Sequence, residues 1–130
     1  MLRLIAALIL LWAAAARAGP DIAAPPLAPS AIFAARGPAE ARGALVWLHE
    51  AHDDRVSPHP PEPEFVGRMA ARGYDIWRYD RAGGRDPLDA GADGLARGLV
   101  ALRAAGYGRL IVAGLSRGGW IALTAARTPG

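Results

Sequence analysis

The residues in this chain best suited to chemistry are a serine set among glycines, Gly114-Leu115-Ser116-Arg117-Gly118-Gly119. An apolar run of strand length, Leu110–Ala113, precedes them, and a mainly apolar run follows. This pattern predicts a strand, a tight turn and a helix. A serine hydroxyl is a poor nucleophile unless a neighbouring base activates it, and a tight strand-to-helix turn would expose its oxygen above the edge of a sheet. The segment therefore predicts covalent catalysis by Ser116.

The glycines around the serine fit the same interpretation. Such a turn brings the residues two before and two after the serine into close approach, so Gly114 and Gly118 are expected where side chains would collide. Gly119 would let the helix pack near the strand. The simpler alternative is a glycine-rich turn in which Ser116 only caps the helix. The buried strand expected before the motif and the helix expected after it favour the nucleophile.

The rest of the chain must position this turn. Continuous apolar runs predict buried strands at residues 44–48, 74–79 and 110–113, and residues 30–36 can form a first edge strand. A short helix is expected over residues 64–72, with Phe65, Met69 and Ala70 on one face. A second helix shows apolar residues at helical spacing, and Gly106 follows its end: Leu88, Ala92, Leu95, Leu99 and Leu102. A last helix is expected over residues 118–127.

This alternation of strands and helices predicts an α/β fold in which a parallel sheet is flanked by helices. Ligands of such sheets bind at the carboxyl ends of the strands. The segments that begin at His49, Asp80 and Ser116 leave those ends. They are therefore expected to converge on one site, and this expectation does not depend on the serine motif.

From about Ala44 to Ala126 the chain resembles the N-terminal half of the α/β-hydrolase fold. Residues 44–49 resemble its third strand and the start of its oxyanion loop, residues 73–80 its fourth strand, and residues 114–119 its nucleophile elbow. The match does not choose among dienelactone hydrolases, esterases and serine peptidases. The resemblance implies a serine hydrolase that cleaves an ester or amide without a cofactor. It also implies an oxyanion hole of two backbone N–H groups, from Arg117 and from Ala51, with Glu50 as the fallback for Ala51.

Two departures from that family stand out. Glutamate, Glu50, occupies the position where the family usually has glycine after the histidine. The family triad runs serine, acid, histidine along the chain, whereas no acidic residue or histidine follows Ser116 here, and all three histidines precede it. We therefore expect a C-terminally truncated fragment of a longer hydrolase. The alternative is a catalytically incompetent or vestigial binding module that keeps the fold, and His52 as an improvised base is a further, weaker alternative.

The loop after residue 48 also invites a metal interpretation, because it carries His49, Glu50, His52, Asp53 and Asp54. A helical His-Glu-x-x-His motif needs histidines four residues apart, whereas these are three apart in a proline-rich segment. No metal site is therefore expected. His49 is interpreted as a structural residue beneath the loop, and Asp80 as a hydrogen-bond acceptor that organises its own loop.

The N-terminus predicts export. Residues 1–18 contain a basic start, a 13-residue apolar run and an Ala-x-Ala site, which are typical of a secretory signal peptide. That run is too short to span a bilayer, so no membrane anchor is expected after cleavage. We therefore expect a bacterial protein that is periplasmic or secreted, with residues 19–43 as a lead-in and residues 44–130 as part of a hydrolase domain.

The composition of the chain limits the classes of partner that it is expected to bind. Without Arg3 and Arg17, which would leave with the signal peptide, 13 arginines face 12 acidic residues, and no basic cluster with stacking aromatics is present. Nucleic acid is therefore not an expected partner, and a small ester, amide or peptide substrate is.

The chain has no cysteine, so packing alone must hold the fold. A parallel sheet of three or four strands would leave an open edge prone to aggregation, and residues 19–130 are expected to be marginally stable or insoluble.

Overall fold

The structure is a computed structural model that describes residues 27–50, 62–80 and 87–127. The predicted signal peptide and most of the loop after residue 50 lie outside the described residues. Within these ranges the order of elements alternates strands and helices after a short first strand. The predicted mixed α/β organisation, with a mostly parallel sheet, is confirmed.

The sheet has four strands in the order β1-β3-β2-β4. Strands β2 (Gly43–Leu48), β3 (Tyr74–Tyr79) and β4 (Leu110–Gly114) are parallel, with β2 between the other two. The register pairs Leu48 with both Tyr79 and Gly114, so the three strands end side by side. The segments that leave these strands therefore start at the same edge, as the sequence predicted.

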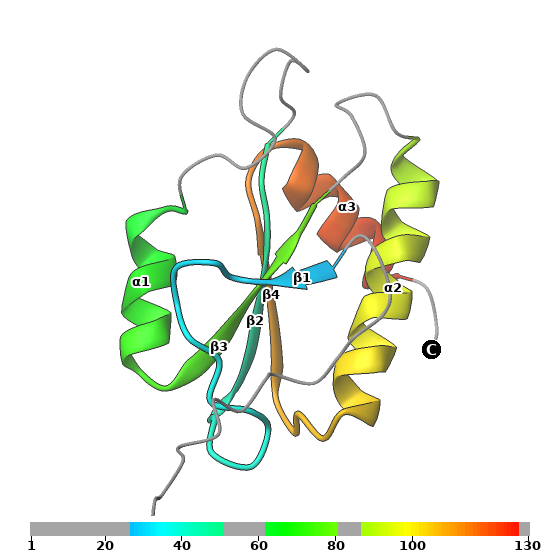
Figure 1. The fold of residues 1–130 in the computed structure, drawn as a ribbon. Coiled ribbons are helices and arrows are strands. Elements are labelled where there is room, and N and C mark those ends of the chain that lie inside the picture. The colour runs from blue at the N-terminus through cyan, green and yellow to red at the C-terminus, as the bar shows by residue number, and fades with distance from the viewer. Residues whose placement is uncertain (1–26, 51–61, 81–86, 128–130) are drawn as a thin grey trace, which may run out of the picture.

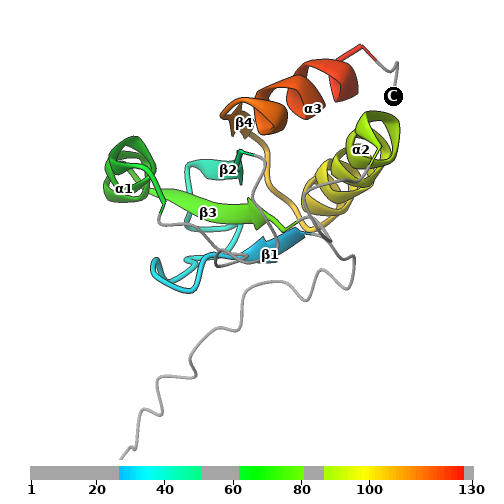
Figure 2. The ribbon, with the colours of Figure 1, turned by 90° about the horizontal axis from the view of Figure 1, so that it is seen from above.

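Helices cover both faces of the sheet (Figures 1 and 2). Helix α1 (Glu64–Ala71) lies on one face, and helices α2 (Leu88–Ala104) and α3 (Arg117–Ala125) lie on the other. Alternate residues of each strand feed two separate apolar clusters, because successive side chains of a strand point to opposite faces. In β2, Ala44, Val46 and Leu48 join the cluster under α2 and α3, while Leu45 and Trp47 join the cluster under α1.

The edge strand is not where the sequence analysis placed it. Strand β1 is Leu27–Pro29, antiparallel to β3, and residues 30–36 form no strand. The Ser30 hydroxyl accepts hydrogen bonds from the backbone N–H groups of Ile32 and Phe33, at 3.1 and 3.3 Å. A side chain that bonds its own backbone in this way competes with the strand ladder. The chain therefore turns at Ser30 and does not continue along β3.

Helix α2 confirms the predicted apolar stripe and explains its glycines. Ala92, Leu95 and Leu102 are buried. A Cβ added at Gly98 would lie 3.0 Å from the Leu27 side chain, so this glycine lets β1 approach the helix. The hydroxyl of Tyr79 donates to the carbonyl of Gly91 at 2.7 Å. Tertiary contacts thus hold a helix whose glycines weaken it intrinsically.

Burial differs in part from what the apolar pattern suggests. In α1 the fully buried residue is Val66, whereas Phe65 is 39% exposed and makes a T-shaped contact with the Trp47 ring at a centroid distance of 5.3 Å. Strand β4 was expected to be buried, but its residues are only half-buried or exposed. The reason is its place at the end of the strand order, where it pairs with β2 alone. Among the described residues no helix is long and apolar enough to cross a membrane.

Candidate functional site

The turn between β4 and α3 holds Ser116 in a strained conformation. Its φ is +50° and its ψ is −118°. Among the described residues it is the one non-glycine with a positive φ. A residue with a side chain rarely adopts this backbone region, and holding it there costs roughly 1–3 kcal/mol. The surrounding structure must therefore impose this conformation.

The glycines of the motif show how it is imposed. A Cβ added at Gly114 would lie 2.4 Å from the carbonyl carbon of Gly118, and one at Gly118 would lie 2.4 Å from the carbonyl oxygen of Leu48. Both distances are far inside van der Waals contact, and both involve backbone atoms that cannot swing away. Gly119 is less tight, at 3.3 Å from the Gly114 oxygen. The backbone of the turn is thus packed against itself and against the end of β2.

Hydrogen bonds fix the turn to the sheet. The N–H of Leu115 donates to the carbonyl of Leu48 at 3.1 Å, which ties the turn to the last residue of β2. Within the turn, the N–H of Gly118 donates to the carbonyl of Leu115 at 2.9 Å, and that of Trp120 donates to the carbonyl of Ser116 at 3.1 Å. The result is a rigid junction at the carboxyl ends of the strands.

The Ser116 side chain takes no part in this bonding. Ser116 occupies the N-cap position of α3, but its hydroxyl makes no capping hydrogen bond, and the residue is exposed. A serine that served only as a cap would have a β-region φ and would accept from an N–H of the first helical turn. The geometry therefore argues against the capping alternative and leaves an exposed hydroxyl on a strained backbone.

Two other predicted residues, His49 and Asp80, lie around the same edge. His49 follows β2 and is buried, and its Nδ1 lies 2.6 Å from the carbonyl oxygen of Glu50. A carbonyl can only accept, so Nδ1 carries the proton. Asp80 follows β3 and accepts from the guanidinium of Arg78 at 3.1 Å. The loops that follow, residues 51–61 and 81–86, lie outside the described residues, so the roles predicted for His49 and Asp80 in them stay predictions.

The structure brings together only part of the predicted set. Arg117 is the first residue of α3, at the end where the helix dipole is positive. Ala51, His52, Asp53, Asp54 and His59 lie outside the described residues. In the part of the chain that is described, no side chain hydrogen-bonds the Ser116 hydroxyl, and no cluster of three metal-ligating side chains occurs.

A buried polar network at the opposite end of the sheet was not anticipated. The Asp75 carboxylate, 2% exposed, accepts from the Tyr107 hydroxyl at 2.7 Å. It also accepts from the backbone N–H groups of Arg36 and Gly37, at 2.8 and 2.9 Å. Burial, together with the hydrogen bond to Asp75 and its charge, raises the pKa of Tyr107 above its ordinary value. The available signal was an acidic residue, Asp75, near the start of the mainly apolar strand β3.

Comparison of the chain with protein-family models, with curated proteins and with solved structures gave no match. The functional interpretation therefore depends on the residues and on the geometry of the turn.

Proposed function

We propose that this chain is the N-terminal part of an exported serine hydrolase of the α/β-hydrolase fold, which cleaves an ester or amide through Ser116. The observation that carries the proposal is the strained, exposed Ser116 at the carboxyl end of a parallel sheet. Strain of this kind persists where the surrounding structure imposes it, and it clusters at active sites. The exposed oxygen and the glycine contacts behind it match what a nucleophile on a strand-to-helix turn requires.

In the proposed reaction the Ser116 Oγ attacks the substrate carbonyl while a histidine removes its proton. The carbonyl oxygen becomes an oxyanion, which accepts hydrogen bonds from the backbone N–H groups of Arg117 and Ala51. The intermediate expels the alcohol or amine, which takes the proton from the histidine and leaves an acyl-Ser116 ester. Water activated by the same histidine then releases the carboxylic acid and restores the serine.

The acid and histidine of this reaction are proposed to come from a segment that follows Gly130, since residues 117–130 contain neither. The proposed leader of residues 1–18 would direct the protein to the periplasm or the medium. The reaction needs no cofactor, and the proposed partners are small esters, amides or peptides.

A second candidate is a binding module that keeps the fold without catalysis. Glu50 favours it, because a carboxylate near the proposed oxyanion position would oppose the developing charge. Strain at Ser116 favours the enzyme, because binding alone does not need it. The reading frame beyond Gly130 separates the two: an in-frame aspartate or glutamate followed by histidine supports the hydrolase, and a stop codon supports the binding module.

The direct test uses the chain together with its in-frame continuation. We expect it to hydrolyse p-nitrophenyl acetate with a burst of p-nitrophenol equal to the enzyme concentration. Ser116→Ala should abolish the burst and lower kcat by at least a hundredfold. Ser30→Ala is the matched control, because Ser30 lies in a turn away from the site, and it should keep the burst. An undiminished burst in Ser116→Ala would rule out the proposed nucleophile.

A further inference from the structure

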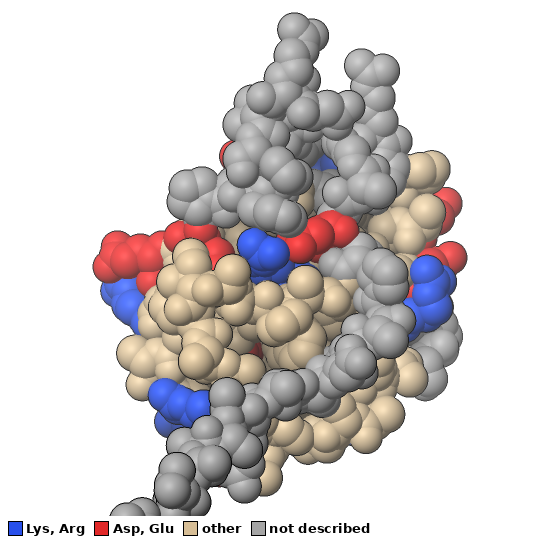
Figure 3. Space-filling model, viewed as in Figure 1, with Lys and Arg blue, Asp and Glu red and all other residues tan. Residues whose placement is uncertain are grey.

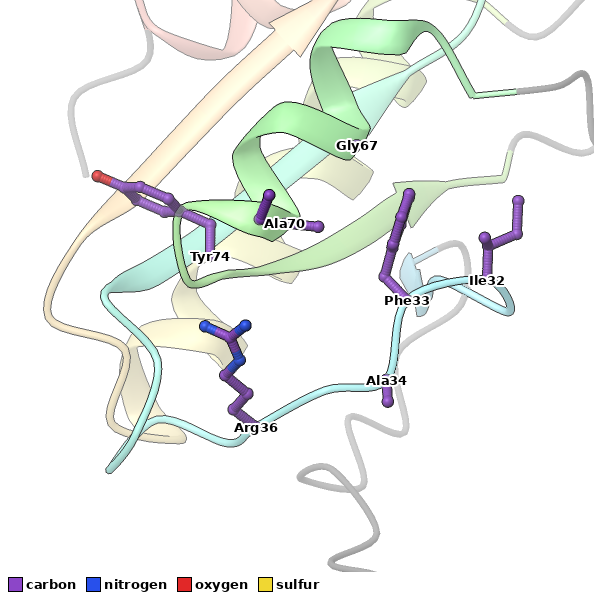
Figure 4. A pocket seen from close by; sticks show the side chains of 8 residues that line it. Ile32, Phe33, Ala34, Arg36, Gly67, Ala70 and Tyr74 are labelled. Atoms are coloured by element: carbon purple, nitrogen blue, oxygen red, sulfur yellow. The ribbon is translucent and has the colours of Figure 1, made fainter.

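A hollow of about 370 Å³ lies beside the start of β3, at the amino end of the strands and away from Ser116 (Figure 4). It is an open depression bordered by α1, by the first residue of β3 and by the segment that connects β1 to β2. Its lining consists of eight residues, mainly apolar: Ile32, Phe33, Ala34, Arg36, Gly67, Ala70, Ala71 and Tyr74. The volume falls in the range of sites for small molecules.

The apolar wall is kept open by small residues of α1. Gly67 and Ala70 face the hollow, and a Cβ added at Gly67 would lie 3.5 Å from the tip of the Phe33 ring. In Figure 4 the Phe33 side chain rises from the opposite side toward Gly67. A glycine inside a helix weakens it relative to alanine. The described surface on this side is mainly uncharged, with charged side chains at its margins (Figure 3).

One end of the hollow is basic. The Arg36 side chain reaches toward the turn between α1 and β3 (Figure 4), where its Nη1 lies 2.9 Å from the Cβ position of Gly73. The Arg42 side chain lies over the same glycine, with its Cγ at 3.2 Å. Arg109 donates to the Tyr74 hydroxyl at 3.3 Å, and this hydrogen bond lowers the pKa of Tyr74.

These guanidinium groups lack an acidic partner in the described part of the chain. No ion pair of Arg36, Arg42 or Arg109 is found there. Asp75 is close in sequence to Tyr74, but its carboxylate is buried and saturated by Tyr107 and two backbone N–H groups. Glu62 is not among the lining residues, and its carboxylate accepts a hydrogen bond from Ser30 at 2.9 Å.

We propose that this hollow binds a small carboxylic acid with an apolar body. The carboxylate pairs with the Arg36 guanidinium, whose planar donors suit two carboxylate oxygens. The apolar body lies between Phe33 and Ala70. Arg36 is the one charged residue of the lining, and a guanidinium beside apolar side chains suits a monoanion with apolar surface better than a strongly hydrated phosphate.

The test titrates 3-phenylpropanoate into the full chain by isothermal titration calorimetry. The neutral isostere 3-phenylpropanamide and inorganic phosphate serve as comparison ligands. We expect the acid to bind and the amide to bind at least roughly tenfold more weakly, because the amide cannot make the charge-assisted hydrogen bond. Phosphate should not compete. Equal binding of acid and amide, competition by phosphate, or no binding of the acid would overturn the proposal.

Two variants locate the site. Arg36→Gln should lower the affinity for 3-phenylpropanoate roughly tenfold and leave the affinity for the amide unchanged. The backbone N–H at position 36 stays available to Asp75. Gly67→Leu should abolish binding of both ligands by filling the hollow, and it improves helix propensity at that position. Arg97→Gln, an exposed arginine on α2, is the matched control for charge. Unchanged acid binding in Gly67→Leu, with a native circular dichroism spectrum, would place the ligand elsewhere and contradict the proposal.

Discussion

The two ends of the parallel strands differ in backbone strain and in hydrogen bonding. At the carboxyl end, backbone packs directly on backbone, and Ser116 is held in a region that residues with side chains rarely adopt. At the amino end, the buried Asp75 accepts three hydrogen bonds of ordinary length and ties the segment after β1 to the sheet. The carboxyl end thus holds Ser116 in a strained backbone conformation, whereas at the amino end the buried Asp75 carboxylate is fully hydrogen-bonded.

This difference indicates how a small α/β fold can hold a strained residue. The cost at Ser116, roughly 1–3 kcal/mol, is a large part of the stability of a small domain. Contacts elsewhere must offset it, and the Asp75 network is one buried contribution of suitable size. Substitutions at one end at a time test this difference.

The largest effect is expected where the turn packs on β2. Gly118→Ala would place a Cβ 2.4 Å from the Leu48 oxygen, and neither group can move without separating α3 from the sheet. We expect the free energy of unfolding to fall by about 3 kcal/mol, measured by urea denaturation with circular dichroism. Gly108→Ala is the matched control, because nothing lies within 4 Å of its Cβ position. Equal stability of the two variants would contradict the close packing.

Removing the buried carboxylate should have the next largest effect. Asp75→Ala leaves the Tyr107 hydroxyl and two backbone N–H groups without their acceptor. The expected loss is about 2 kcal/mol in the free energy of unfolding. Asp93→Ala, at an exposed position of α2, should change it by less than about 0.5 kcal/mol. If the losses are equal, the network does not stabilise the amino end.

Relieving the strain should stabilise the protein. Ser116→Gly allows the positive φ without a Cβ, so we expect a gain of about 1 kcal/mol in the free energy of unfolding. Ser116→Ala removes the same hydroxyl but keeps the Cβ, and it should leave stability nearly unchanged. A loss of stability in Ser116→Gly would show that Ser116 is not strained, and would remove the contrast between the two ends.

The smallest expected effect is a pH dependence of the free energy of unfolding, which arises from Tyr107 at the amino end. The pKa of Tyr107 is raised in the folded protein, so its contribution is complete below the ordinary tyrosine pKa of about 10 and is lost as the pH rises above it. The lowered pKa of Tyr74 acts in the opposite direction. Between pH 9 and 11 the wild type should therefore lose more stability than Tyr107→Phe does. If the free energies of unfolding of the wild type and of Tyr107→Phe change with pH in parallel, Tyr107 is not the source of the pH dependence.

Much of the fold follows from local pattern. The runs around Leu45, Ile76 and Ile111 predicted the three parallel strands, and the spacing of Ala92 and Leu95 predicted the buried stripe of α2, because each pattern reflects burial along one element. The edge strand could not be placed, since residues 30–36 have a strand-like composition. Their backbone bonds instead with the Ser30 hydroxyl and the Asp75 carboxylate, and the second of these partners lies 39 residues away from Arg36.

The turn that carries Ser116 was predictable from the sequence, but its packing against the sheet was not. The spacing of Gly114, Ser116 and Gly118 predicted the turn, because side chains at the two glycine positions would collide. The contact of Gly118 with Leu48 depends on which strand neighbours β4, and no local pattern specifies that neighbour. The half-burial of β4 and the basic end of the hollow at Arg36 also arise from pairings between distant segments.

Phosphonylation is the most direct test of Ser116 as an acyl-accepting nucleophile. A fluorophosphonate probe is applied to the chain with its in-frame continuation beyond Gly130, and the modified residue is identified by mass spectrometry. We expect one adduct, on Ser116, absent from Ser116→Ala, and no adduct on the 130-residue chain alone, whose residues after Ser116 include no acid or histidine. An unlabelled Ser116 in a folded chain whose continuation supplies both an acid and a histidine would show that Ser116 is not the nucleophile.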